Sequence, residues 1–122
     1  MQTVSVVIAN HDTVAASGLA DALRRYFRSV SVARSLDEVR SAIPRQRADL
    51  AVVDLETVSL SDVQQLRHEF DQTQVLCVHR IADEEMWTQA LSAGAVDCLQ
   101  SADVAGIMHA IGASTQVRSN AA

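Results

Sequence analysis

A carboxylate near the end of an apolar run is the most informative group for chemistry in this sequence. Residues 48–55 read Ala-Asp-Leu-Ala-Val-Val-Asp-Leu, with β-branched residues at the centre and Asp54 near the end. Such a run is typical of a strand that is buried on both faces of a parallel sheet. Open α/β sheets place their chemistry at the carboxyl ends of their strands, so Asp54 is a candidate functional residue.

Polar side chains follow other apolar runs of the chain in the same way. They are Asn10, His11 and Asp12 after the first run, His79 at the end of the fourth, and Ser101 after the fifth. If these runs are parallel strands of one sheet, their carboxyl ends lie at one edge of it. We therefore expect these side chains to border a single crevice together with Asp54.

Two imidazoles and two carboxylates in one crevice could hold a transition metal such as Zn²⁺. The set would be His11, His79, Asp12 and Asp54. Their spacing along the chain matches no metal-binding motif, so we expect no metal at this position. The alternative is that the two imidazoles hydrogen-bond the carboxylates directly.

Strand-like and helix-like patterns alternate along the whole chain. We predict strands at residues 4–9, 30–33, 49–54, 75–79 and 96–99. We predict helices at residues 13–27, 35–43, 60–70, 83–93 and 104–111. These elements form one domain over residues 4–113, and a small, polar and flexible tail follows at residues 114–122.

Start and stop signals support several helix boundaries. Ser35 and Glu38 have the spacing of a capping box, in which each side chain accepts a free backbone N–H. Asp83 can cap the fourth helix and Gly94 can end it, because glycine tolerates a positive φ. Pro44 is expected to end the second helix.

Five β–α units with short connections predict an α/β fold. The expected architecture is a single, doubly wound, five-stranded parallel sheet of flavodoxin-like type, with helices on both faces and strand order 2-1-3-4-5. The switch point of that order lies between the first and third strands. It would bring residues 10–12 alongside Asp54.

Composition excludes several classes of protein. The 122 residues carry a net charge of −5, which argues against direct nucleic-acid binding by this chain. All ten basic residues are Arg, and the sequence contains no Lys. Cys77 and Cys98 are too few for a disulfide framework, and both fall in apolar runs where a reduced thiol acts as a small hydrophobe. With no signal peptide and no membrane-spanning run, we expect a cytoplasmic protein.

The order of elements resembles the receiver domain of bacterial two-component response regulators. The resemblance covers about residues 4–113 and rests on residues 6–12, 48–54 and 83–95. It implies that Asp54 stands at the position that accepts a phosphoryl group from a histidine kinase. It also implies that an acidic pair after the first strand and that aspartate hold Mg²⁺, in a signalling module that is not an enzyme.

The chain departs from the receiver pattern at nearly every supporting position of the pocket. The acidic pair is Asn10 and His11, the hydroxyl position after the fourth strand is His79, and the Lys position is Ser101. A transferring phosphoryl group is stabilised by positioning and by positive charge. We therefore expect an atypical receiver with a degenerate pocket, no bound cofactor and no standard phosphorylation.

Two alternatives share this fold. The first is a phosphorylatable receiver that uses Asn10, Asp12 and Asp54 as a weakened Mg²⁺ site. The second is a flavodoxin-like enzyme or cofactor carrier. Residues 10–18 lack the Ser, Thr and Gly run that would cradle a phosphate, which argues against this second alternative.

The resemblance also implies a partner surface. In receivers the face made by the fourth helix, fifth strand and fifth helix is the usual dimer surface, and Met86, Cys98 and Met108 fall on these elements. Cys98 stands where the family has Tyr or Phe. Adaptable Met side chains suit a partner surface, although core packing is equally consistent and is expected for Trp87. We expect a homodimer regulated by a partner or small ligand, with a DNA-binding output domain outside this chain controlling transcription.

Overall fold

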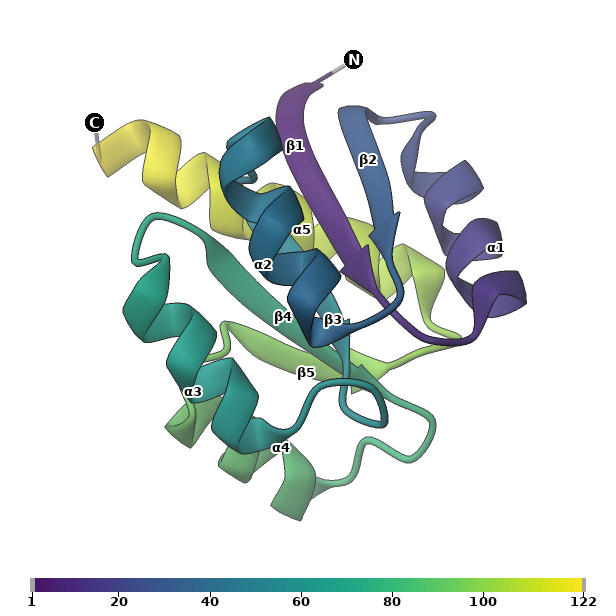
Figure 1. The fold of residues 1–122 in the computed structure, drawn as a ribbon, viewed down its shortest axis with the longest axis vertical. Helices are drawn as coiled ribbons and strands as arrows, with labels where there is room; N and C mark the ends of the chain where they lie inside the picture. The colour runs from purple at the N-terminus through teal and green to yellow at the C-terminus, as the bar shows by residue number, and fades with distance from the viewer. Residues whose placement is uncertain (1, 122) are drawn as a thin grey trace.

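The computed structural model describes the backbone of residues 2–121 and the side-chain burial of residues 3–115. Its five parallel strands form one sheet in the order β2-β1-β3-β4-β5 (Figure 1). The strands are β1 (Gln2–Ala9), β2 (Phe27–Ala33), β3 (Leu50–Asp54), β4 (Gln74–His79) and β5 (Asp97–Gln100). The helices are α1 (Thr13–Leu23), α2 (Leu36–Gln46), α3 (Leu60–Glu69), α4 (Glu84–Ser92) and α5 (Val104–Ala121). The predicted doubly wound, flavodoxin-like α/β fold is confirmed.

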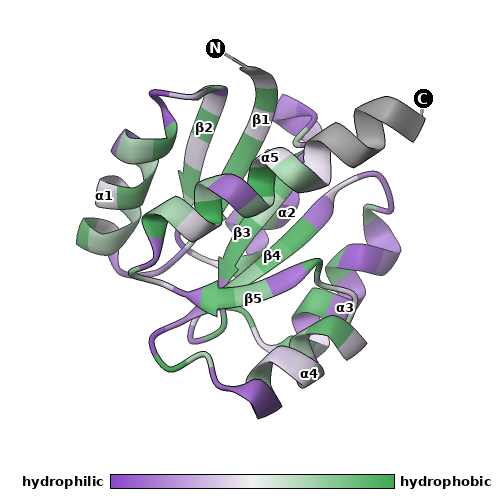
Figure 2. Cartoon of the chain, turned by 180° about the vertical axis from the view of Figure 1, so that it is seen from behind, coloured by the Kyte–Doolittle hydropathy of each residue, from purple (hydrophilic) through white to green (hydrophobic). Residues whose placement is uncertain are grey.

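Helices cover both faces of the sheet and create two hydrophobic cores. Helices α1 and α5 cover one face, and α2, α3 and α4 cover the other (Figures 1 and 2). The buried side chains of each group form one core with the sheet. Because both faces are covered, residues 50–53 of β3 are fully buried, as the apolar run predicts. In the described part of the chain, no helix has both the length and the hydropathy that crossing a bilayer requires.

The first helix ends earlier than we predicted. Phe27, which we placed at the end of this helix, opens β2, pairs with Gln2 of β1 and is only 2% exposed. Tyr26, just before it, is 51% exposed. Helical spacing of apolar residues continues past Leu23, but pairing with β1 fixes the backbone as a strand and overrides that local pattern.

The second and fifth helices run further than we predicted. Pro44 lies inside α2, which continues to Gln46 before Arg47 ends it with a φ of 51°. A proline in the last turn removes a single backbone donor, so the helix can pass through it. α5 continues to Ala121, so residues 114–121 are helical where we expected a tail. The flexibility of that segment stays a prediction.

Most of the predicted caps are present. Ser35 accepts the N–H of Glu38, but the Glu38 carboxylate reaches the N–H of Arg34 rather than that of Ser35. Asp83 caps α4 by accepting the N–H of Met86. Gly94 follows α4 with a φ of 107°, which confirms the conformation expected of it.

Candidate functional site

Asp54 lies at the carboxyl edge of the sheet, where the loops after β1, β3, β4 and β5 leave it (Figure 1). Ala9 of β1 pairs with Val53 of β3, so the next residues, Asn10 and Asp54, are neighbours at that edge. The Asp54 side chain is half-buried, and its Oδ1 accepts the N–H of Glu56 at 3.0 Å. The fold therefore places Asn10 and Asp54 side by side at the edge of the sheet where the switch-point argument puts them.

Asn10 and Asp12 each use one side-chain oxygen to accept hydrogen bonds from nearby backbone. Asn10 Oδ1 accepts the N–H of Asp12 at 2.9 Å. Asp12 Oδ1 accepts the N–H groups of Val14 and Ala15, both at 3.1 Å, and so caps α1. An N-cap carboxylate satisfies donors that have no partner within the helix and interacts favourably with the helix dipole. Asp12 thus serves the helix, and it is exposed.

His11 contacts the loop that follows β3. Its backbone N–H donates to Thr57 Oγ1 at 3.0 Å, and its Nδ1 lies 2.7 Å from the same oxygen. The direct imidazole–carboxylate bond that we considered for His11 is replaced by this contact with a hydroxyl. The reason is that the β3–α3 loop brings Thr57, rather than the Asp54 carboxylate, to the imidazole.

His79, the last residue of β4, is held by two contacts. Its Nδ1 accepts the N–H of Ile81 at 3.0 Å, so this nitrogen carries no proton. Its Nε2 lies 3.5 Å from Glu56 Oε1, and that oxygen also accepts a hydrogen bond from Arg80 Nε at 2.7 Å. The carboxylate partner of His79 is therefore Glu56, whereas we had considered Asp12 and Asp54.

Sequence reasoning missed Glu56 and Thr57. Both follow Asp54 within three residues, and each ties the β3–α3 loop to a neighbouring loop through His11, His79 or Arg80. A polar pair directly after the central strand was the available signal. It could not show which groups these side chains would reach, because the partners lie far away in the sequence.

Ser101 lies in the turn after β5, beside the end of β4. Its N–H donates to the carbonyl of His79 at 3.0 Å, next to the paired residues His79 and Gln100. Within residues 3–115, whose side chains the structure describes, no cluster of three or more His, Cys, Asp or Glu side chains is arranged to hold a metal ion. The donor set of the crevice also fits Mg²⁺ poorly, because the Asn10 oxygen and the Asp12 capping oxygen are engaged by backbone N–H groups.

The expected partner surface is more buried than the sequence suggested. Cys98 is 5% exposed and belongs to the core, while Met86 and Met108 are partly buried against the two cores. Trp87 is 45% exposed, so its predicted core position is wrong. Its indole N–H donates to Asp97 Oδ1 at 3.0 Å, a partner that lies at the rim of the sheet rather than in the apolar core.

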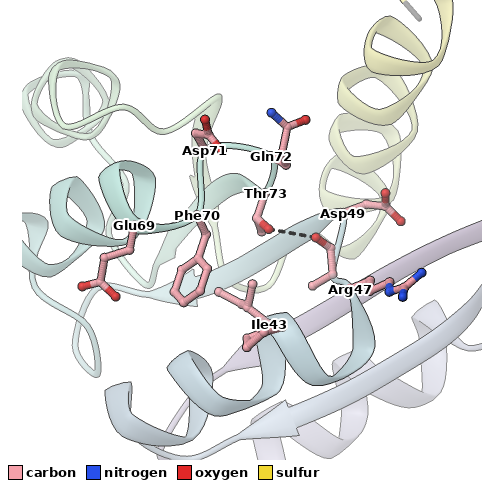
Figure 3. A pocket seen from close by; sticks show the side chains of 10 residues that line it. Ile43, Arg47, Asp49, Glu69, Phe70, Asp71, Gln72 and Thr73 are labelled. Atoms are coloured by element: carbon pink, nitrogen blue, oxygen red, sulfur yellow. Dashed lines mark hydrogen bonds between the residues drawn. The ribbon is translucent and has the colours of Figure 1, made fainter.

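A pocket of about 440 Å³ lies at the opposite edge of the sheet, between the ends of α2 and α3. In Figure 3, Ile43 and Phe70 point toward each other, whereas the charged groups of Arg47 and Glu69 point away. Thr73 and Ala48 both line the pocket, and Thr73 Oγ1 donates a hydrogen bond to the carbonyl of Ala48. Because these charged groups do not converge, the pocket offers no defined polar site for a ligand.

Comparison with known proteins gives matches among solved structures only. No family model matches this sequence, and no curated protein matches it. The receiver domain of the Francisella response regulator 1452 superposes with a TM-score of 0.85 at 16% identity, over 95% of this chain and 99% of that one. A CheY-like receiver domain protein from Methanospirillum hungatei JF-1 gives 0.85 at 15% identity, over 99% and 100%.

A third structure adds chemical context. It is a response regulator protein from Burkholderia pseudomallei with a phosphorylated aspartic acid, a calcium ion and citrate. Its TM-score is 0.78 at 24% identity, over 98% of this chain and 73% of that one. This chain has the receiver fold. The predicted pocket residues lie at the same edge of the sheet as Asp54. They are Asn10, His11, Asp12, His79 and Ser101.

Proposed function

We propose that this chain is a receiver-type signalling module that acts without Mg²⁺-dependent phosphorylation of Asp54, and that it is not an enzyme. The receiver fold and the position of Asp54 at the carboxyl end of β3 support the signalling part of this proposal. The hydrogen bonds around Asp54 support the second part, that the chain acts without Mg²⁺-dependent phosphorylation.

The observation that carries the proposal is the engagement of the groups that would serve a metal and a phosphoryl group. Asn10 Oδ1 and Asp12 Oδ1 accept backbone N–H groups, and His79 Nδ1 accepts another. A Mg²⁺ ion would have to compete with these bonds, and it loses water reluctantly. The local network therefore favours a crevice that is stable without a cation.

The positive charge beside the crevice already forms an ion pair with a carboxylate. Arg80 is the basic residue that follows β4, and its guanidinium binds the carboxylate of Glu56 at 2.7 Å. Ser101 stands at the position where the receiver pattern has Lys, and the sequence contains no Lys. Phosphoryl transfer needs preorganised positive charge, so this pocket lacks its main source of stabilisation.

Output through a partner completes the proposal. We propose a homodimer that uses the face of α4, β5 and α5, with Met86 and Met108 as adaptable apolar contacts at its rim. A small-molecule ligand or partner protein would take the place of a histidine kinase as the input. A DNA-binding domain of the same protein would then control transcription in the cytoplasm.

The alternative is a phosphorylatable receiver. The Burkholderia structure, which contains a phosphorylated aspartic acid and a calcium ion, favours it because that chain shares the fold. Asp54 is half-buried rather than fully buried, so a phosphodonor could reach it. In this case Asn10, Asp12 and Asp54 would form a weak cation site.

Incubation with acetyl phosphate and Mg²⁺, followed by intact mass measurement, separates the two functions. We expect no phosphoryl adduct on the wild-type chain and the same mass for Asp54→Asn. An adduct on the wild-type chain that Asp54→Asn abolishes would establish the alternative instead. Calorimetric titration with Mg²⁺ gives a second measurement, in which we expect no binding in the low millimolar range.

A gain-of-function variant tests whether the pocket chemistry is the missing part. The variant supplies the acidic pair, the hydroxyl and the ammonium group that the receiver pattern has. It carries four substitutions: Asn10→Asp, His11→Asp, His79→Thr and Ser101→Lys. We expect this variant to acquire a phosphoryl adduct when it is incubated with acetyl phosphate and Mg²⁺. Adding Asp54→Asn to the same variant should remove the adduct, which identifies the site.

A further inference from the structure

Two cysteines lie side by side on the last two strands of the sheet. Cys77 of β4 and Cys98 of β5 are register partners in the parallel pairing of these strands. Both belong to the core cluster on the side of α2, α3 and α4, so their side chains leave the sheet on the same face. Both are reduced, free cysteines. The sequence places them 21 positions apart, and the fold makes them neighbours.

The backbone spacing suits a covalent bond between these thiols. Adjacent strands lie about 4.8 Å apart, which falls within the range of about 4.4–6.8 Å that separates the Cα atoms of a disulfide. The Cβ atoms of parallel register partners are about as far apart as the strands, whereas a disulfide brings them to about 3.8 Å. Bond formation therefore requires the strands to approach by about 1 Å.

β5 can make such a movement more easily than any inner strand. It is the last strand in the sheet order, so it pairs with β4 on one side only. It is also only four residues long. Because a disulfide formed in this way is held slightly off its preferred geometry, it is readily reduced again.

We propose that Cys77 and Cys98 form a reversible intramolecular disulfide when the protein meets hydrogen peroxide. This makes the β4–β5 pair a redox-modification site, separate from the crevice at Asp54. The proposal does not depend on whether Asp54 is phosphorylated, because it involves only the two core thiols of β4 and β5 and no group of the crevice.

The chemistry proceeds in two balanced steps. Cys98 is the less buried thiol, at 5% exposed against 0% for Cys77, so its sulfur attacks a peroxide oxygen first. The O–O bond breaks, water leaves with the thiol proton, and Cys98 becomes a sulfenic acid. Cys77 then attacks that sulfur, the S–O bond breaks and a second water leaves. Two thiols lose two electrons in all, and one hydrogen peroxide becomes two waters.

The surroundings of the two thiols make this reaction slow until the strand opens. Burial raises the pKa of Cys98, and the charges of Asp97 and Asp83 raise it further. Burial and the neighbouring Cys98 raise the pKa of Cys77 to about 12. Since the thiolate is the nucleophile, oxidation follows transient opening of β5 and α4 rather than direct attack on the closed structure.

Asp97, the residue before Cys98, connects the buried thiol to the exposed side chain of Trp87. Asp97 Oδ1 accepts the N–H of Cys98 at 2.8 Å and the indole N–H of Trp87 at 3.0 Å. A shift of β5 toward β4 would therefore alter the contact of Trp87, which is exposed on α4. Trp87 is the single tryptophan of the chain, so its fluorescence reports on this contact.

Treatment of the full chain with hydrogen peroxide, followed by denaturation and alkylation of free thiols, tests the proposal. We expect the number of alkylated cysteines to fall from two to none, with the chain monomeric on a non-reducing gel. The Trp87 emission should shift with the same time course. Dithiothreitol should restore both alkylation sites and the original emission.

Three variants provide controls. Cys77→Ala and Cys98→Ala should each keep one thiol that oxidises to sulfenic or higher acids, without the reversible change in Trp87 emission. Cys98→Ala combined with Leu99→Cys moves the second thiol to the opposite face, because Leu99 pairs with Val78 and packs on the α1 and α5 side. This variant should form no disulfide.

Three results would overturn the proposal. The first is two alkylatable thiols in the wild-type chain under conditions that oxidise the single-cysteine variants. The second is independent over-oxidation of both thiols, and the third is a disulfide that forms only between chains. None of these results changes the outcome of the acetyl phosphate experiment, so failure here is distinguishable from failure of the proposed function.

Discussion

At the scale of single residues, the crevice shows how identical chemical groups take different roles according to their neighbours. Asp12 follows β1 one residue after the two positions that hold the acidic pair in the receiver pattern, and its Oδ1 accepts two N–H groups of α1. Asp54 ends β3 and accepts one N–H in its own loop. Two carboxylates at the same edge of the sheet therefore stabilise different segments of backbone, the first turn of α1 and the β3–α3 loop.

Replacing Asp12 measures the capping role. Asp12→Ala removes the acceptor of two helix N–H groups, and we expect a loss of about 1 kcal/mol in the free energy of unfolding. Urea denaturation followed by circular dichroism gives this value. Asp12→Asn is the matched control, because asparagine caps helices about as well, and it should stay within a few tenths of a kcal/mol of wild type. Equal losses in both variants would show that the charge, not the cap, is needed.

At the scale of elements, the connection from α4 to β5 depends on one glycine. Gly94 has a φ of 107°, and the next residue donates its N–H to the carbonyl of Ala90. A Cβ at Gly94 would lie 3.0 Å from Cγ of Arg67. Arg67 cannot easily move, because its Nη1 donates to the carbonyl of Thr73 at 2.6 Å. The turn thus fixes where β5 begins.

Gly94→Ala should therefore destabilise the protein. We expect a loss of about 1–3 kcal/mol, because alanine rarely adopts this backbone conformation and its methyl group meets a fixed neighbour. Gly18→Ala is the matched control. Gly18 lies within α1 with no atom near its missing Cβ, so alanine should stabilise the protein by about 0.5–1 kcal/mol. Thermal or urea unfolding of both variants checks this, and a neutral Gly94→Ala would contradict the argument.

At the scale of the whole molecule, a buried thiol links folding to pH. Burial and the neighbouring Cys98 raise the pKa of Cys77 from 9.0 to about 12 in the folded chain. Between these values the unfolded chain loses this proton and the folded chain keeps it. The resulting stability is fully present below about pH 9 and is lost as the pH rises toward 12, at up to about 1.4 kcal/mol per pH unit.

Cys77→Ala should remove this part of the pH dependence. Between pH 9 and pH 11, we expect the free energy of unfolding of the wild type to fall more steeply than that of the variant, by about 1 kcal/mol per pH unit. Urea titrations with a reductant present measure both slopes. Below pH 9 the two slopes should agree, and parallel slopes above pH 9 would mean that Cys77 ionises normally in the fold.

The elements of this fold were predictable where several local signals agreed. The apolar run around Asp54, the cap at Asp83 and the glycine at residue 94 each placed an element, because burial, capping and backbone freedom act over a few residues. Boundaries failed where tertiary pairing opposed the local pattern. Phe27 fits a helical stripe, but its pairing with Gln2 makes it a strand residue.

The sequence by itself indicated the parallel sheet and the edge at which Asp54 and its neighbours lie, because hydrophobic periodicity identifies buried strands and their polar ends. Right-handed crossovers left only a few strand orders, and 2-1-3-4-5 was predicted because it is the usual order for a sheet of this size. Only the tertiary structure decided which atoms meet there: His11 with Thr57, and His79 and Arg80 with Glu56. It alone also placed Cys77 opposite Cys98. These pairings depend on strand register and on the paths of loops that are distant in the sequence, so no local pattern records them.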